Sequence, residues 1–246
     1  MSTQTVLLRH YEKNNMQYRP HVLAASLMLA VTSAMAQSAV ANPAAVSSAK
    51  TFPLQGEYAQ IETSNTRAMV GLLNGGTAAD KAMVVDTLVQ RPGKFQPPVL
   101  FAVSQTLFQA GKKDDAAFLF YAAQLRARMD ANLSTDPSAG QAVGILSQRY
   151  GPQINQYMLQ DLDKAQQLMA QVQAWDLQTP YDYDRRWISL HGMGAFLASS
   201  NPGQAAKPLM VAEDQWQAVI AKTRKDYFDG FRESLDELRA SAAAKR

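Results

Sequence analysis

The chain has no cysteine and only three histidines in 246 residues, and two of these, His10 and His21, lie close to the N-terminus. His191 is therefore the single histidine of the remaining sequence. This inventory excludes a disulfide framework, a thiol nucleophile, anchoring through a lipidated cysteine, a cysteine-based zinc site and any site that requires two histidines. The patterns GxSxG, GxxxxGK(S/T), HExxH and GxGxxG are also absent, so we predict no catalytic residue, no cofactor and no metal ligand.

The sequence also lacks an apolar run of the ~20 residues that a membrane-spanning helix needs. Its most apolar stretch, residues 22–31, follows the basic residues Arg19 and His21. The small-residue pattern of residues 33–36, which ends at Ala36, then resembles a signal-peptidase cleavage site. We therefore predict a secretory signal that is cleaved after Ala36, a periplasmic location, and no stable membrane anchor after cleavage.

These features divide the chain into three predicted parts. Residues 1–36 form the signal, residues 37–56 a flexible lead-in rich in alanine, serine and proline, and residues 57–246 one helical domain. A mature chain of about 210 residues can bury a sizeable core in one domain. Because the residues before Met16 are polar and long for the start of a signal, translation from Met16 is the alternative.

Beyond the predicted signal, basic and acidic side chains are almost equal in number. The whole chain carries 24 basic and 21 acidic side chains, and the first 36 residues hold three of the basic ones and one of the acidic ones. The remainder therefore has 21 basic and 20 acidic side chains and a formal charge of +1. Nucleic-acid binding needs a clustered basic face, so this balance, together with export, argues against a nucleic-acid partner.

Residues 97–132 combine turn residues and helical periodicity in a way that predicts a helical hairpin. Two prolines set φ for a helix start, and apolar residues then recur at helical spacing up to Gly111, where a left-handed C-terminal cap is expected. Asp114 is the expected N-cap of a second helix that ends near Met129.

This hairpin resembles a tetratricopeptide repeat. The consensus spacing is matched by large and small residues alike, and the small ones would allow two helices to approach closely. The matching residues are Leu100, Val103, Ser104, Leu107, Gly111, Ala116, Phe120 and Ala123. The consensus tryptophan and the closing proline are absent, and the resemblance covers one repeat of ~34 residues.

Helical periodicity continues on both sides of the hairpin. Residues 64–76 and 77–90 predict a preceding helical pair, whose second helix begins at Thr77 in a near capping-box arrangement. Further apolar stripes predict helices over residues 142–150, 162–175 and 216–238, and no convincing alternation of period two is found. We therefore predict an all-α fold of antiparallel helical hairpins, in a TPR-like, solenoid-like stack or an irregular bundle.

Residues 179–196 form the most unusual stretch because they concentrate aromatic, arginine and aspartate side chains. Tyr, Trp and Arg dominate protein-interface hot spots, which makes the stretch a candidate partner-binding surface. A metal held by Asp182, Asp184 and His191 is a narrower hypothesis. The structural alternative is a turn and a capped helix whose tryptophan enters the core, with its arginines paired to carboxylates. The candidate partner-binding residues are Tyr181, Tyr183, Arg185, Arg186, Trp187 and His191.

Two other groups of residues support alternative functions. Glu57 and Glu62, or Asp182 and Asp184, could supply a carboxylate pair for a cell-wall hydrolase. Methionines at helical spacing could line an adaptable groove for a small apolar ligand, although such residues usually fill a core. These methionines are Met69, Met83, Met158, Met169, Met193 and Met210.

The sequence therefore favours a non-enzymatic, exported protein-binding module on a TPR-like scaffold. Helical hairpin stacks present surfaces to other chains, so a protein or peptide in the periplasm is the expected partner. By analogy of type, an immunity protein that neutralises a toxin, or an envelope adaptor, fits this outline. A cell-wall enzyme and a carrier of an apolar ligand are the alternatives, and the sequence leaves the oligomeric state open.

Overall fold

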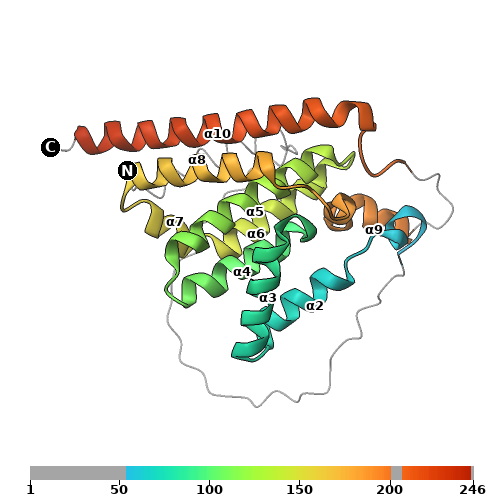
Figure 1. The fold of residues 1–246 in the computed structure, drawn as a ribbon. Helices are drawn as coiled ribbons and strands as arrows, with labels where there is room; N and C mark the ends of the chain where they lie inside the picture. Colours follow the sequence, from blue (N-terminus) through green and yellow to red (C-terminus); the bar gives the residue numbers. More distant parts are fainter. Residues whose placement is uncertain (1–53, 201–206, 245–246) are drawn as a thin grey trace, which may run out of the picture.

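The computed structural model describes residues 54–200 and 207–244 and folds them into helices (Figure 1). The all-α prediction is confirmed, since the described residues contain no strand and only an isolated bridge between Ser134 and Met210. The predicted signal and most of the predicted lead-in lie outside these residues. The elements, with 3-10 helices written η, are η2 (Gly56–Gln60), α2 (Ser64–Gly75), α3 (Ala78–Gln90), η3 (Pro92–Lys94), α4 (Pro97–Gln109), α5 (Lys113–Leu133), η4 (Pro137–Gly140), α6 (Gln141–Tyr150), α7 (Pro152–Met158), α8 (Leu162–Gln178), η5 (Arg185–His191), α9 (Met193–Ser200) and α10 (Glu213–Ala243).

The predicted hairpin is the pair α4 and α5. Gly111 lies in the turn between them with φ +80°, the left-handed conformation expected of the cap. The prediction of Asp114 as N-cap is wrong, because α5 already begins at Lys113 and Lys112 is its N-cap. The Asp114 carboxylate instead accepts a hydrogen bond of 2.6 Å from the Tyr157 hydroxyl, which ties the start of α5 to α7. The helix also continues past Met129 to Leu133.

Helix α5 is the centre around which the other helices pack. It contacts α4 most extensively, and α6, α7, α8 and α10 also lie against it (Figure 1). Consequently most of its residues from Ala116 to Leu133 are buried, including the polar residues Gln124, Arg126 and Asp130. One helix surrounded by elements from several parts of the chain is the arrangement of a bundle, and TPR-like stacking is not confirmed.

Local signals set the ends of the other predicted helices. Thr77 caps α3 in a full capping box, since its side chain accepts from the Asp80 backbone and the Asp80 carboxylate accepts from the Thr77 backbone. Asp161 caps α8 by accepting a hydrogen bond from the Lys164 backbone. Helices α8 and α10 run antiparallel along one side of α5, while α2 and α3 lie on the other side of α4 (Figure 1). The predicted helical pair before the hairpin is thus confirmed.

Two glycine substitutions separate backbone strain from packing. Gly111→Ala places a side chain in open space but in a left-handed backbone, so we expect the free energy of unfolding to fall by about 1–2 kcal/mol. Gly71→Ala, in the exposed middle of α2 with equally open space, should raise it by about 0.5–1 kcal/mol. Urea unfolding followed by circular dichroism measures both values. Equal effects of the two substitutions would contradict the assigned Gly111 conformation.

Candidate functional site

A buried carboxylate of α5 binds side chains of the candidate stretch, residues 179–196. Asp130 in α5 is fully buried and accepts three hydrogen bonds, from the Tyr183 hydroxyl at 3.0 Å, Arg185 Nε at 2.6 Å and Trp187 Nε1 at 2.8 Å. Burial raises the pKa of the Asp130 carboxyl, while the Arg185 charge and the three donors oppose that rise. Three side chains of the stretch are thereby fixed to one acceptor.

A second buried carboxylate, Asp176 of α8, ties the same stretch to α10. Its oxygens accept hydrogen bonds from Arg224 Nε at 3.0 Å and Nη2 at 2.8 Å, and from the Tyr181 hydroxyl. Burial raises the pKa of Tyr181 above its usual value, and the neighbouring Asp176 adds to the effect. The tyrosine is therefore a neutral hydrogen-bond donor at physiological pH.

Arg126 of α5 connects these features from the centre of the bundle. Its fully buried guanidinium lies over two rings, with Cζ 4.4 Å from the Trp175 centroid and 4.1 Å from the Tyr181 centroid. It donates to the backbone oxygens of Thr179 at 2.8 Å and Pro180 at 3.2 Å. The start of the candidate stretch is thus bound through its backbone as well as its side chains.

The six candidate residues differ in exposure. Trp187 and Arg185 are buried, with 2% and 7% of their surface exposed, whereas Tyr181, Tyr183 and Arg186 are half-buried. His191 is exposed, and its ring meets the Trp187 ring edge-on with centroids 5.7 Å apart. The structural interpretation of this stretch is confirmed for Trp187, which lies in the core. Partner binding stays a prediction. Of the six residues, Arg186 and His191 are the two with solvent-facing surface that do not bond to Asp130 or Asp176.

Two of the four acids proposed for catalysis, Glu57 and Asp184, meet at Arg186. Its guanidinium lies 3.1 Å from Glu57 Oε1 and 2.8 Å from Asp184 Oδ2, and Asp184 also caps η5. Partial burial would raise the pKa of Asp184, but hydrogen bonds from Arg186 hold it below its usual value. Hydrogen bonds from Ser64 likewise lower the pKa of Glu62. Asp184 and Glu62 are therefore ionised near pH 7, which does not match the general acid that glycoside hydrolysis requires.

Asp182 is separate from this group, because it forms an exposed ion pair with Lys94, 2.8 Å between Nζ and Oδ2. Within residues 54–200 and 207–244 no group of three or more histidine, aspartate or glutamate side chains is arranged to hold a metal ion. The structure therefore gives no support to a metal bound by Asp182, Asp184 and His191.

Helix α9 begins within the candidate stretch, and backbone hydrogen bonds attach its first residues to η4 and the residue before it. The amide of Met193 donates to Ser138 Oγ at 2.7 Å, and the amide of Gly194 donates to Asp136 Oδ2 at 2.7 Å. The carboxylate approaches so closely that a Cβ at Gly192 would lie 2.2 Å from Asp136 Oδ2. The two glycines thus permit a contact that the sequence did not reveal.

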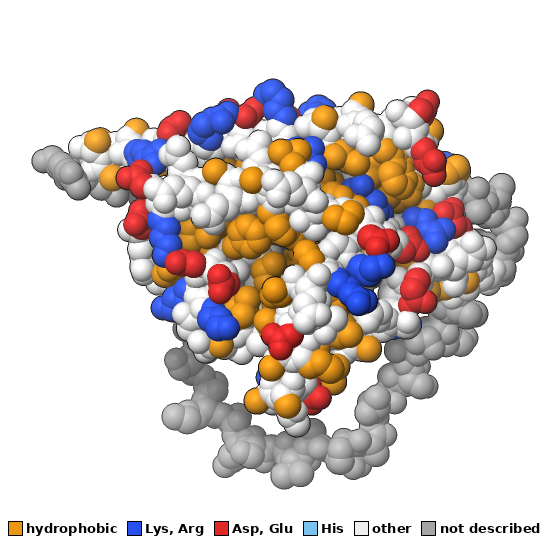
Figure 2. Space-filling model, in the orientation of Figure 1, with side chains coloured by type: hydrophobic (Ala, Val, Ile, Leu, Met, Phe, Trp, Pro, Cys, Tyr) orange, Lys and Arg blue, Asp and Glu red, His pale blue; other side chains and the backbone are white. Residues whose placement is uncertain are grey.

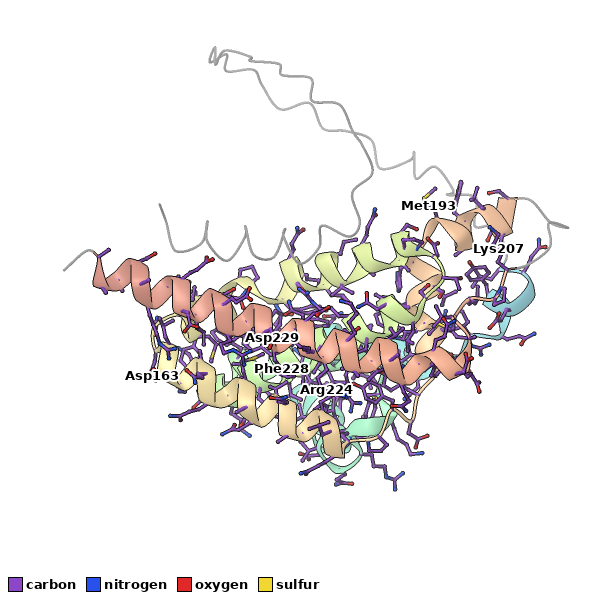
Figure 3. The ribbon with its side chains drawn as sticks, turned by 90° about the horizontal axis from the view of Figure 1, so that it is seen from above. Asp163, Met193, Lys207, Arg224, Phe228 and Asp229 are labelled. Carbon is purple, nitrogen blue, oxygen red and sulfur yellow. The ribbon has the colours of Figure 1, made fainter. Side chains whose placement is uncertain are left out.

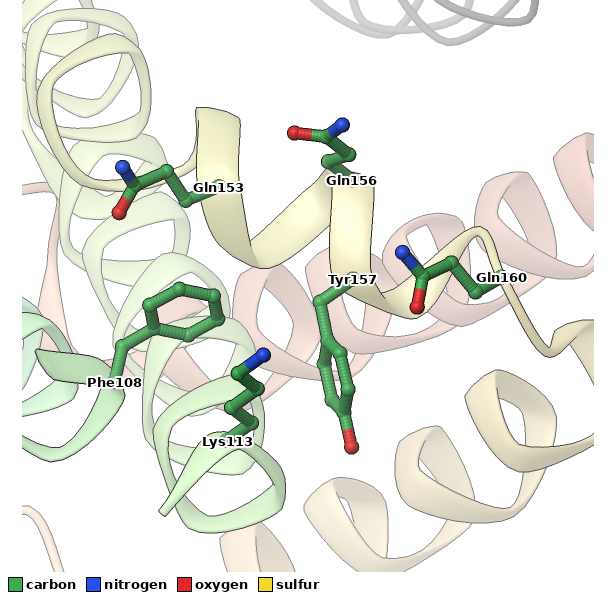
Figure 4. A pocket seen from close by; sticks show the side chains of 6 residues that line it. All are labelled: Phe108, Lys113, Gln153, Gln156, Tyr157 and Gln160. Carbon is green, nitrogen blue, oxygen red and sulfur yellow. The ribbon is translucent and has the colours of Figure 1, made fainter. Parts of the chain in front are cut away.

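A surface hollow of about 300 Å³ lies elsewhere, at the turn between α4 and α5 (Figure 4). The rings of Phe108 and Tyr157 meet edge-on with centroids 6.3 Å apart, and Lys113 Nζ lies 5.6 Å and 5.5 Å from them. Gln153, Gln156 and Gln160 complete its lining. None of the six candidate residues belongs to this hollow.

The methionines proposed to line one groove lie on different helices. Met158 in α7 and Met169 in α8 are buried core residues, whereas Met193 in α9 is 57% exposed. Helices α7 and α9 lie at opposite ends of the molecule (Figure 1). A more continuous apolar area is visible in Figure 2, where hydrophobic side chains gather over α4 and α5 between α8 and α3. The six methionines therefore do not share one ligand groove.

Comparison with known proteins gives no relative: no family model, no curated protein and no solved structure matches this chain. Among the described residues, no helix has the length and apolar character to cross a membrane.

Two aspartates, one buried and one exposed, allow a matched test of the buried network. Asp130→Ala leaves the buried Arg185 without its carboxylate, so we expect the free energy of unfolding to fall by about 3–5 kcal/mol. Asp182→Ala removes an exposed pair and should change it by less than about 1 kcal/mol. Urea unfolding compares the two variants. A loss for Asp130→Ala no larger than that for Asp182→Ala would contradict the network.

The Asp136 contact predicts a dependence of stability on pH. Partial burial would raise the pKa of Asp136, but hydrogen bonds from Ser138 and the Gly194 amide hold it below its usual value. Since the folded pKa lies below the unfolded value of about 3.9, the contact stabilises the fold above about pH 4 and is lost as pH falls through the folded pKa.

Asp136→Asn should therefore lower the free energy of unfolding by about 1–2 kcal/mol at pH 7, and the gap from the wild type should close below about pH 4. Urea unfolding between pH 7 and pH 3 measures this gap. A gap that stays constant over the whole range would assign the loss to altered packing and would count against an ionised Asp136.

Proposed function

We propose that this chain is an exported, non-enzymatic protein-binding module of the bacterial periplasm. The observation that carries the proposal is the fixed shape of residues 179–191, which are held by the buried carboxylates Asp130 and Asp176. A surface that is ordered before binding loses less conformational entropy when a partner docks. The TPR-like hairpin and the predicted signal support the same class of function.

The surface that this arrangement offers is smaller than the set of six residues named from sequence. Trp187 and Arg185 are buried, and Tyr181 and Tyr183 donate to the buried carboxylates. Arg186 and His191 have solvent-facing surface and lie outside that network. Arg186 is itself oriented by Glu57 and Asp184, so its guanidinium has one preferred position. An oriented arginine and an exposed histidine on the same short helix, η5, suit a polar edge of an interface, and α9 follows η5 directly in the chain.

The alternatives receive less support. A hydrolase needs one carboxyl with a raised pKa beside a second, ionised carboxylate, and the acids around Arg186 are instead ion-paired or hydrogen-bonded. A carrier of an apolar ligand needs an enclosed apolar cavity, whereas the hollow at Tyr157 contains a lysine and three glutamines. An immunity-type toxin neutraliser and an envelope adaptor both remain within the proposed class.

The test uses the mature chain, residues 37–246, immobilised and exposed to periplasmic and secreted fractions. We expect one protein to be retained in a stoichiometric amount, and Arg186→Ala with His191→Ala to weaken its binding by about tenfold or more, since interface arginines often contribute more than 1 kcal/mol. The affinity of the purified pair is then measured by isothermal titration calorimetry.

The control is Gln153→Ala with Arg232→Ala, two exposed side chains on α7 and α10. Both double variants should keep the helical circular-dichroism signal of the wild type. Retention of no protein would remove the support for a binding module. Equal binding by both double variants would keep the module but place its surface away from Arg186 and His191.

A further inference from the structure

Helix α9 presents large apolar side chains to solvent. Met193 is 57% exposed, Phe196 58% and Leu197 48%, while Ala195 is the buried residue of the helix. Figure 3 shows Met193 at the edge of the molecule, away from the bundle of α5, α8 and α10. Clusters of exposed large apolar side chains mark interaction sites more often than single ones do.

The backbone contacts of α9 explain how it stays in place with so little of its surface buried. Its first amides donate to Ser138 and Asp136, as described above, and the Tyr58 hydroxyl approaches so closely that a Cβ at Gly194 would lie 2.6 Å from it. Because α9 is attached through backbone amides and glycines, its large side chains are not needed to hold it in place. The helix is therefore fixed to the bundle at its start, and its apolar face is exposed to solvent.

The spacing of these side chains indicates what they fit. Residues 193, 196 and 197 stand at positions i, i+3 and i+4 and share one helix face. This is the anchor pattern of a helix that inserts its apolar face into a groove of another protein. We propose that α9 is such an anchor and that its partner is a folded protein with an uncharged, apolar groove about one helix wide. This inference deepens the proposed function and rests on it.

Two other occupants agree less well with the residues present. A second copy of the chain would bring two α9 faces together, and three side chains of about half exposure fall short of the ~800 Å² per partner that standard interfaces bury. An anionic lipid surface attracts helices with lysine and arginine on their polar face, whereas α9, MGAFLASS, has no charged residue. An apolar groove accepts anchors that share one helix face and needs no charge, so it matches both the spacing and the composition of α9.

The experiment replaces Phe196, in the full chain, with the photo-crosslinking amino acid p-benzoylphenylalanine, and Val89 on α3, which is 67% exposed, in a matched control. After irradiation in the native cells, we expect the probe at position 196 to join one protein, with the adduct mapped to apolar residues of a groove. The probe at position 89 should not join that protein.

The crosslinked protein is then purified and titrated against the wild-type chain. Phe196→Ala should weaken binding by about 30-fold or more, and Val89→Ala should leave it unchanged. Both residues are exposed, so both variants should unfold at the same urea concentration as the wild type. Loss of affinity without loss of stability supports the assignment of α9.

The remaining outcomes overturn the inference in distinguishable ways. An adduct with a second copy of the chain, or with lipid, replaces the proposed partner. A protein partner that binds Phe196→Ala as tightly as the wild type leaves the proposed function in place but removes α9 from the interface. The absence of any adduct at position 196, with no protein retained by the immobilised chain, contradicts both the inference and the proposed function.

Discussion

Two buried carboxylates are the constraint on which the rest of this structure depends. Asp130 and Asp176 lie at the centre of the bundle with fully buried side chains, and a carboxyl group there is tolerated only when hydrogen-bond donors satisfy its oxygens. Their own helices do not supply those donors. They come from residues 179–187 and from Arg224 of α10, so the ordering of these distant segments is coupled to the presence of the acids.

This coupling gives a physical reason for the composition of the candidate stretch. Tyrosine, tryptophan and arginine each combine a large apolar body with a hydrogen-bond donor, which is what a buried carboxylate requires of its neighbours. The same residue types are enriched in interface hot spots, so composition alone does not distinguish an internal network from a binding surface. Here Trp187 serves the network, while His191 stands outside it and faces solvent.

The sequence could predict the features that depend on neighbouring residues. Thr77 and Asp80 define the start of α3, Gly111 defines the α4–α5 turn, and apolar spacing of 3.6 residues locates the long helices, because each of these signals acts within a few positions. The N-cap prediction for Asp114 is wrong because it considers only neighbouring residues. It expects the carboxylate to bond within its own helix, whereas the structure pairs it with Tyr157 and Lys164.

The network could not be predicted in this way, since Tyr183, Arg185 and Trp187 lie 53, 55 and 57 residues after Asp130. One local signal did exist. Arg126 and Asp130 are charged residues four positions apart in a helix whose apolar residues occur on nearly every side, and burial of charged residues implies partners from elsewhere in the chain. The signal predicts that partners exist but cannot identify them.

Residues 179–197 thus reverse the usual arrangement of polar side chains outside and apolar side chains inside. Charged and hydrogen-bonding side chains are directed inward to Asp130 and Asp176, while the apolar side chains of α9 face solvent. Neither the buried network nor the exposed apolar face of α9 gives an isolated protein its lowest free energy. Buried ion pairs often stabilise a fold no more than apolar residues would. Both halves become reasonable together if the network fixes the position of η5 and α9 for a partner. Stability alone would favour Phe196 inside the bundle, and its exposure is an observation on which the proposed binding function rests.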